Sequence, residues 1–253
     1  MSGLYVFGVV QADALADASA FGPGLGGAQL RLLPGEQGLA ALVADAPAEP
    51  PEATRRNMLG HTAVLERAIA AADVLPVRFA TVAPDATRLA GCLDRNAAAF
   101  RVALAAIAGR IELGVKASWQ EGVAVRDILA ADAGLRALRD RLQNRPATQT
   151  YQERIELGRR VEAAMNTMRD RDAAMLAARL DPLAERCITL KPVDDSMVLN
   201  RAFLVRRDRE TEFDAAMREL GEAQGARMSF RYIGPVPPYN FVTLRADWLG
   251  EAA

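Results

Sequence analysis

The chain has 253 residues, of which 51% are hydrophobic and 25% are charged, and its formal net charge is −1 at pH 7. This composition is typical of a folded protein with a full core and argues against long disorder. Because basic and acidic residues nearly cancel, the sequence also argues against nucleic-acid binding. No apolar run is long enough for a membrane span, and the N-terminus does not resemble a signal peptide, so we expect a cytoplasmic protein.

The first part of the chain predicts an α+β domain over residues 1–120. Its opening apolar run has the β-rich composition of a central strand, and the two runs after the first loop read as a hairpin. Two stretches with helical spacing follow, separated by a strand that contains Pro76, which suggests an edge or a bulge. The expected strands are 4–10, 29–33, 39–44, 74–79 and 110–119, and the expected helices are 52–72 and 84–107.

The middle of the chain changes to helical composition. Residues 122–181 contain no convincing strand and are interrupted at Asn144–Pro146, which predicts a hairpin of two helices. In the second helix, Met168 and Met175 belong to a pattern with heptad-like spacing, and Met165 is a third methionine of the same helix. These are explained either by ordinary packing within the hairpin or by an adaptable contact surface.

β-strand character returns after Pro182. We expect strands at 186–190, 197–205 and 228–233, with a helix over 208–223 that ends near Gly225. Strand, strand, helix, strand is part of a ferredoxin-like arrangement. The sequence therefore predicts a second α+β domain over residues 121–253 that begins with the helical hairpin, and the two domains share a ferredoxin-like-related plan.

A proline-rich segment follows the last expected strand. Pro235, Pro237 and Pro238 remove backbone donors, so this stretch can be neither a helix nor an interior strand. Tyr239 and Phe241 add rings to a stiff backbone, an arrangement that suits recognition at low entropic cost. A rigid turn between two core strands explains the same residues, and burial of the two rings distinguishes these alternatives.

Residues that could support catalysis are scarce. His61 is the only histidine and lies within a helical pattern, so we interpret it as a packing or capping residue. The two isolated cysteines, Cys92 and Cys187, fit buried free thiols, and no pattern has the spacing of metal ligands. Arg78 lies in an apolar strand and must find a partner or reach water, which fits a structural ion pair or a ligand contact. We predict no catalytic residue, cofactor or metal.

Four segments together resemble a known family, the gas vesicle synthesis proteins GvpF/GvpL. They occur in the family's order across nearly the whole chain. Two departures are Ala80, where the family usually has glycine, and Val236, where a tryptophan is expected between two prolines. The four segments are Tyr5–Val10, the block from His61–Glu66 to Val74–Val82, Glu112–Ala117, and Ile233–Val242.

The resemblance implies an accessory protein of gas vesicle formation without enzymatic activity. It implies that the protein is located in the cytoplasm or on the gas vesicle, and the gas-facing surface of the vesicle is one of the expected locations. It also implies association with the hydrophobic shell protein and with other gas vesicle proteins. On this basis we predict that the proline-rich segment, and with it the methionine-bearing helix, binds newly made shell subunits. Two other classes remain open, a small-molecule sensing module on a ferredoxin-like fold and, more distantly, an enzyme of unknown chemistry.

Overall fold

The computed structural model describes residues 3–14, 17–49 and 51–242. The chain divides into two compact units. Unit 1 takes in the described residues up to 113, together with 204–207 and those from 234 onward, and unit 2 takes in 114–203 and 208–233. The chain contains helices and two antiparallel sheets, which confirms the α+β class.

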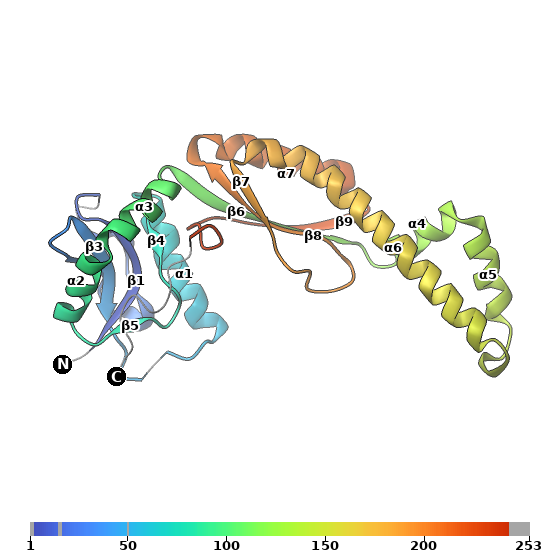
Figure 1. The fold of residues 1–253 in the computed structure, drawn as a ribbon, viewed down its shortest axis with the longest axis horizontal. Coiled ribbons are helices and arrows are strands. Elements are labelled where there is room, and N and C mark those ends of the chain that lie inside the picture. The colour runs from blue at the N-terminus through green and yellow to red at the C-terminus, as the bar shows by residue number, and fades with distance from the viewer. Residues whose placement is uncertain (1–2, 15–16, 50, 243–253) are drawn as a thin grey trace. The chain divides into compact units, whose positions relative to one another are not determined.

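Unit 1 is built on a sheet whose central strand is β1 (Leu4–Gln11), as predicted (Figure 1). The strand order is β2-β3-β1-β4, and β5 also pairs with β1. The register places Leu4 opposite Asp45, and a bulge lies between Val6 and Gly8. The other strands are β2 (Arg31–Pro34), β3 (Leu39–Asp45), β4 (Leu75–Pro76) and β5 (Val82–Ala83).

Helices cover both faces of this sheet because β1 buries its side chains on both sides. Tyr5 and Phe7 contact His61 of α1 (Arg55–Ile69). Leu4 and Val6 instead join the core formed with α2 (Ala86–Arg95) and α3 (Ala97–Ile107). This continuous hydrophobic run, without polar alternation, is typical of a strand buried between two helical layers.

The second sheet has the order β7-β8-β6-β9, with α6 and α7 running along it (Figure 1). Its strands are β6 (Arg110–Trp119), β7 (Arg186–Thr189), β8 (Met197–Arg206) and β9 (Met228–Val236). The helices are α4 (Val123–Ala131), α5 (Ala133–Gln143), α6 (Tyr151–Leu180) and α7 (Glu210–Gln224). Phe213 of α7 packs on Phe203 of β8 and stacks on Tyr232 of β9, which fixes this helix to the sheet.

Both sheets use one strand order. When the four main strands of each sheet are numbered along the chain, both read 4-1-3-2, with β5 left outside the count. The second sheet connects its first two strands through α4, α5 and α6, whereas the first uses a loop with two short 3₁₀ turns, Ala18–Phe21 and Leu25–Gly27. The suspected common plan of the two halves therefore extends to the order of their strands.

Several predicted elements differ from the observed ones. The helix expected over 84–107 is two helices, α2 and α3, that meet at Asn96. The first helix of the hairpin is also divided, because the Asp132 carboxylate accepts the backbone N–H of Leu135 and starts α5. The strand expected over 74–79 is limited to Leu75–Pro76, with the Val77 N–H also donating to the Phe7 carbonyl oxygen of β1 at 2.9 Å. These breaks shorten elements without changing their order.

Cys187 corrects the prediction of two buried thiols. Cys92 is buried in α2, whereas Cys187 is exposed. The reason is the sheet order, since β7 is an edge strand and an apolar pattern alone does not show which strand lies at an edge.

Candidate functional site

The first candidate site is a buried polar cluster in unit 1, centred on Tyr5 and His61. The carbonyl oxygen of Val77 lies 3.1 Å from His61 Nε2, and because a carbonyl only accepts, Nε2 carries the proton. Nδ1 is then an acceptor, so the Tyr5 hydroxyl donates to it at 2.9 Å. Burial lowers the pKa of His61 to about 4 and raises that of Tyr5 to about 12, so both groups are neutral at pH 7.

The loop after β4 closes onto the same hydroxyl. The backbone N–H of Ala80 donates to Tyr5 Oη at 3.0 Å. Ala80 reaches this position with φ of 65°, the only positive φ at a non-glycine residue among those described. The left-handed conformation costs a residue with a Cβ about 1–2 kcal/mol, which explains why glycine suits this position better than the alanine found here.

Glu112 of β6 ties the proline-rich segment to unit 1. Its buried carboxylate accepts the backbone N–H of Asn240 at 2.8 Å and the Asn240 side-chain amide at 2.5 Å. Burial raises the pKa of Glu112, and the two bonds from Asn240 oppose that shift. Glycine is needed at position 234, because Gly234 has a φ of 128° and a Cβ at this position would lie 2.8 Å from the carbonyl oxygen of Glu112.

The proline-rich segment is mostly covered. Pro235 is exposed in the last part of β9, but Pro237 and Pro238 are buried. Phe241 is 9% exposed, and Tyr239 is only partly accessible. The Tyr239 hydroxyl is buried without a hydrogen-bond partner among the described residues, and burial raises its pKa. This burial favours the architectural alternative for the two rings.

All four segments of the family resemblance therefore contribute to unit 1. Tyr5, His61, Ala80, Glu112 and Asn240 come from these segments and form two hydrogen-bonded groups. Burial raises the pKa of the Tyr239 hydroxyl, and the nearby Tyr5 and Glu112 raise it further. Sequence reasoning selected the segments but missed the pairing of Glu112 with Asn240, since 128 positions separate them.

The methionine-bearing helix α6 is held to the second sheet through the buried carboxylate of Asp172. Asp172 is 3% exposed and accepts from Trp119 Nε1 of β6 at 2.9 Å and from Arg227 at 3.1 Å. The guanidinium of Arg169 also lies 5.5 Å from the centre of the Trp119 ring. Met168 is buried, while Met165 and Met175 are half-buried. Packing within the unit accounts for Met168.

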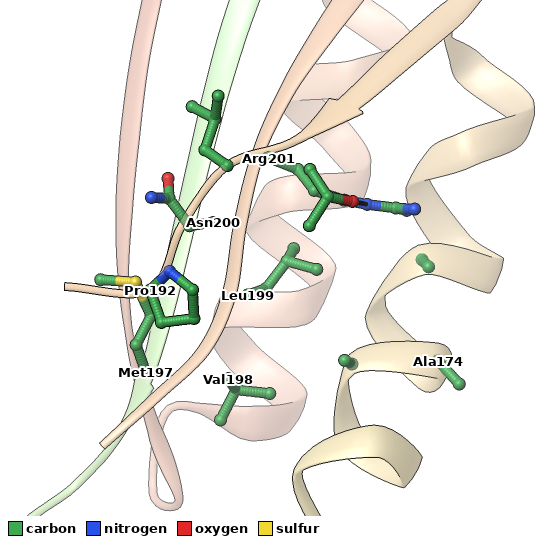
Figure 2. Close-up of a pocket in the computed structure, with 11 residues that line it drawn as sticks. Ala174, Pro192, Met197, Val198, Leu199, Asn200 and Arg201 are labelled. Carbon is green, nitrogen blue, oxygen red and sulfur yellow. Dashed lines mark hydrogen bonds between the residues drawn. The ribbon is translucent and has the colours of Figure 1, made fainter. Parts of the chain in front are cut away.

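A second candidate site is an apolar groove of about 250 Å³ between α6 and the β7–β8 strands (Figure 2). Three small side chains of α6, Ala173, Ala174 and Ala177, form one wall. Leu190, Pro192 and Val198 are among the residues that line the strand side. Figure 2 shows Arg201 reaching from β8 toward α6, and Asp181 binds its guanidinium at 2.7 and 3.0 Å. The groove therefore offers apolar surface with its one charge neutralised.

The last predicted site residue, Arg78, is exposed, so its guanidinium reaches water. Within the described ranges, no group of three or more histidine, cysteine, aspartate or glutamate side chains could hold a metal ion. In the same part of the chain, none of the helices is long and apolar enough to cross a lipid bilayer.

Comparison with known proteins identifies the family. Residues 3–243 match the family described as gas vesicle synthesis protein GvpL/GvpF. The chain belongs to this family. Gas vesicle protein F of Streptomyces sp. (strain CB03234) is 36% identical over 205 residues, which cover 81% of this chain and 84% of that protein. Gas vesicle protein F of Nostoc sp. (strain PCC 7120) is 26% identical over 248 residues, or 96% and 99% of the two chains.

Solved GvpF structures share the fold. The crystal structure of GvpF from Anabaena sp. PCC7120 has a TM-score of 0.82 and 26% identity, covering 97% of this chain and all (100%) of that one. GvpF from Microcystis aeruginosa, at 23% identity and a TM-score of 0.80, covers 96% and 100% and supports the fold alone. Membership in the GvpL/GvpF family assigns the chain to gas vesicle formation.

Proposed function

We propose that this protein is an accessory protein of gas vesicle assembly that binds the hydrophobic shell protein, associates with other gas vesicle proteins, and helps the shell to nucleate or grow. Its site of action is the cytoplasm and the vesicle, including the gas-facing surface. The observation that carries this proposal is the apolar groove beside α6, because an aggregation-prone apolar subunit needs a partner that covers its surface.

The polar clusters support a role without catalysis. Tyr5, His61 and Glu112 have the chemistry of general acids and bases, but their hydrogen bonds go to one another or to the backbone and side chain of neighbouring residues. A catalytic group needs a substrate within hydrogen-bond reach. We therefore assign these side chains to the architecture of unit 1 and propose that the protein is not an enzyme.

We further propose that both halves are related to the ferredoxin-like fold. The support is the strand order 4-1-3-2 in both sheets, combined with the βαββαβ succession of the second. In the first half the loop with two 3₁₀ turns takes the place of the first helix. Such folds host many functions, so this relationship adds nothing to the assignment of the partner.

Co-purification tests the proposed partner. The full chain, carrying an affinity tag, is expressed with the shell protein of the same organism, and we expect the shell protein to be retained on the resin. A tagged unrelated α+β protein of similar size is the control for adhesion of the apolar subunit. Retention by both proteins, or by neither, would contradict specific binding.

A second experiment addresses the site of action. Deletion of the gene in a vesicle-forming cell is expected to abolish or shorten vesicles. Purified vesicles are then treated with protease before and after collapse. Protection before collapse and digestion afterwards supports the gas-facing surface, whereas absence of the protein from vesicles assigns it to assembly alone.

A further inference from the structure

The outer edge of β7 borders the apolar groove and is open to strand pairing. The strand order places β7 at the end of its sheet, beside β8. The backbone N–H of Leu190 donates to the Asn200 carbonyl oxygen at 2.7 Å, so the polar backbone groups of Leu190 face β8. Because these groups alternate along an antiparallel strand, those of Ile188 also face β8, and those of Cys187 and Thr189 face outward.

The chemistry of the adjoining groove limits what a partner strand can carry. Its helical wall consists of alanines, which leave room for side chains from outside. Arg201 is the one charged side chain among the residues that line it, and Asp181 neutralises that charge. A charged side chain placed there would be desolvated without a counter-ion, at a cost that excludes it. The complementary occupant is uncharged, apolar and extended.

We propose that the shell subunit docks by adding an extended apolar strand to the outer edge of β7, with alternate side chains in the groove beside α6. This inference rests on the proposed function and specifies its binding mode. Strand addition supplies backbone hydrogen bonds, and the pockets that receive alternate side chains supply selectivity. Since β7 has 4 residues, the backbone pairing is short and the groove supplies most of the buried apolar area.

Two substitutions test the two parts of this mode separately. Ala173→Asp places a carboxylate on the helical wall of the groove, and its matched control is Ala163→Asp, an exposed alanine of the same helix that does not line the groove. Cys187→Pro removes one outward N–H without removing a bond to β8, and its control, Cys187→Ser, keeps that N–H. Thermal unfolding of each purified variant verifies that it is folded.

Binding is measured by co-purification of the full chain with the shell protein. We expect Ala173→Asp and Cys187→Pro each to reduce the retained shell protein about tenfold or more, equivalent to about 1.4 kcal/mol, while both controls retain it as the wild type does. If the wild type binds and both test variants bind equally, the docking mode is wrong and the proposed function stands. Loss in Ala173→Asp alone would overturn the strand addition. No binding by the wild type would overturn the proposed function and this inference together.

Discussion

The two units stabilise their interiors with different polar chemistry. In unit 1, Tyr5 and His61 are neutral at pH 7, and they form hydrogen bonds to each other and to the backbone. In unit 2, the buried carboxylate of Asp172 accepts from Arg227 and from Trp119. A buried neutral histidine makes stability depend on acid, whereas a buried acceptor shared by two donors makes it depend on the presence of that acceptor. The two clusters should therefore be broken by different changes.

The largest effect is expected from removing the Asp172 carboxylate. Asp172→Ala leaves the Trp119 N–H without its acceptor and removes one of the two carboxylates that bind Arg227, while Asp127 remains, so we expect a loss of up to about 3 kcal/mol. Urea unfolding monitored by tryptophan fluorescence measures this loss. Asp170→Ala, an exposed aspartate two positions away on α6, is the control and should change the free energy of unfolding by less than about 0.5 kcal/mol. Equal effects would contradict the assigned role.

Acid should act on unit 1 through His61. Its pKa is lowered to about 4 in the folded chain, from an ordinary value near 6.5, so the unfolded chain binds the proton more tightly. Stability is then fully present above pH 6.5 and is lost as the pH falls toward 4, by roughly 2–3 kcal/mol at pH 4.5. His61→Gln should weaken unit 1 but remove this part of the pH dependence. An unchanged slope between pH 6.5 and 4.5 in the variant would show that another group is responsible.

The bond between Glu112 and Asn240 should have the next largest effect. Asn240→Ala removes the side-chain donor at 2.5 Å and leaves one buried carboxylate oxygen without that partner. Hydrogen bonds to charged groups contribute about 1.5–3 kcal/mol, and because the backbone N–H remains, we expect the lower end of that range. Asn240→Asp provides a sharper comparison, since a second carboxylate beside Glu112 should destabilise unit 1 more than alanine does. Amide hydrogen exchange of residues in β1 and β6 localises the change.

The smallest effect should be stabilising. Ala80→Gly relieves the left-handed backbone at φ of 65° while retaining the N–H that binds Tyr5. Removing the backbone strain stabilises the folded state, and the greater conformational freedom of glycine in the unfolded chain offsets part of this effect. We therefore expect the free energy of unfolding to increase by about 1 kcal/mol or less. Ala83→Gly, at a buried β5 position without this conformation, should instead destabilise the protein. A lower melting temperature for Ala80→Gly would refute the conformational argument.

The sequence contained enough to predict the class, the order of the elements and the buried first strand. Hydrophobic periodicity is local, so it located β1, α1 and the long helix α6. The break in the helical hairpin at Asp132 could also have been predicted from the sequence, because an aspartate three residues before Leu135 is a typical N-cap. The exposure of Cys187 could not have been predicted, since only the sheet order makes β7 an edge strand.

The candidate sites were less predictable than the fold. The segments containing Tyr5, His61, Glu112 and Asn240 were recognisable as a set, but the bond between Tyr5 and His61 spans 56 positions and that between Glu112 and Asn240 spans 128. The groove could not be predicted either, because Ala173 and Leu190 become neighbours only through the packing of α6 on the strands. Contacts between residues this far apart in the sequence produce no local pattern from which they could be predicted.

The return of the chain from β9 to unit 1 has a consequence for the order of synthesis. Asn240 and Phe241 complete unit 1, yet they leave the ribosome after every residue of unit 2. Domains ordinarily fold in the order in which they are made. Here unit 1 lacks Asn240, the donor to the Glu112 carboxylate, until every residue of unit 2 has been made, so premature termination near residue 236 should yield a chain in which unit 1, rather than unit 2, is defective.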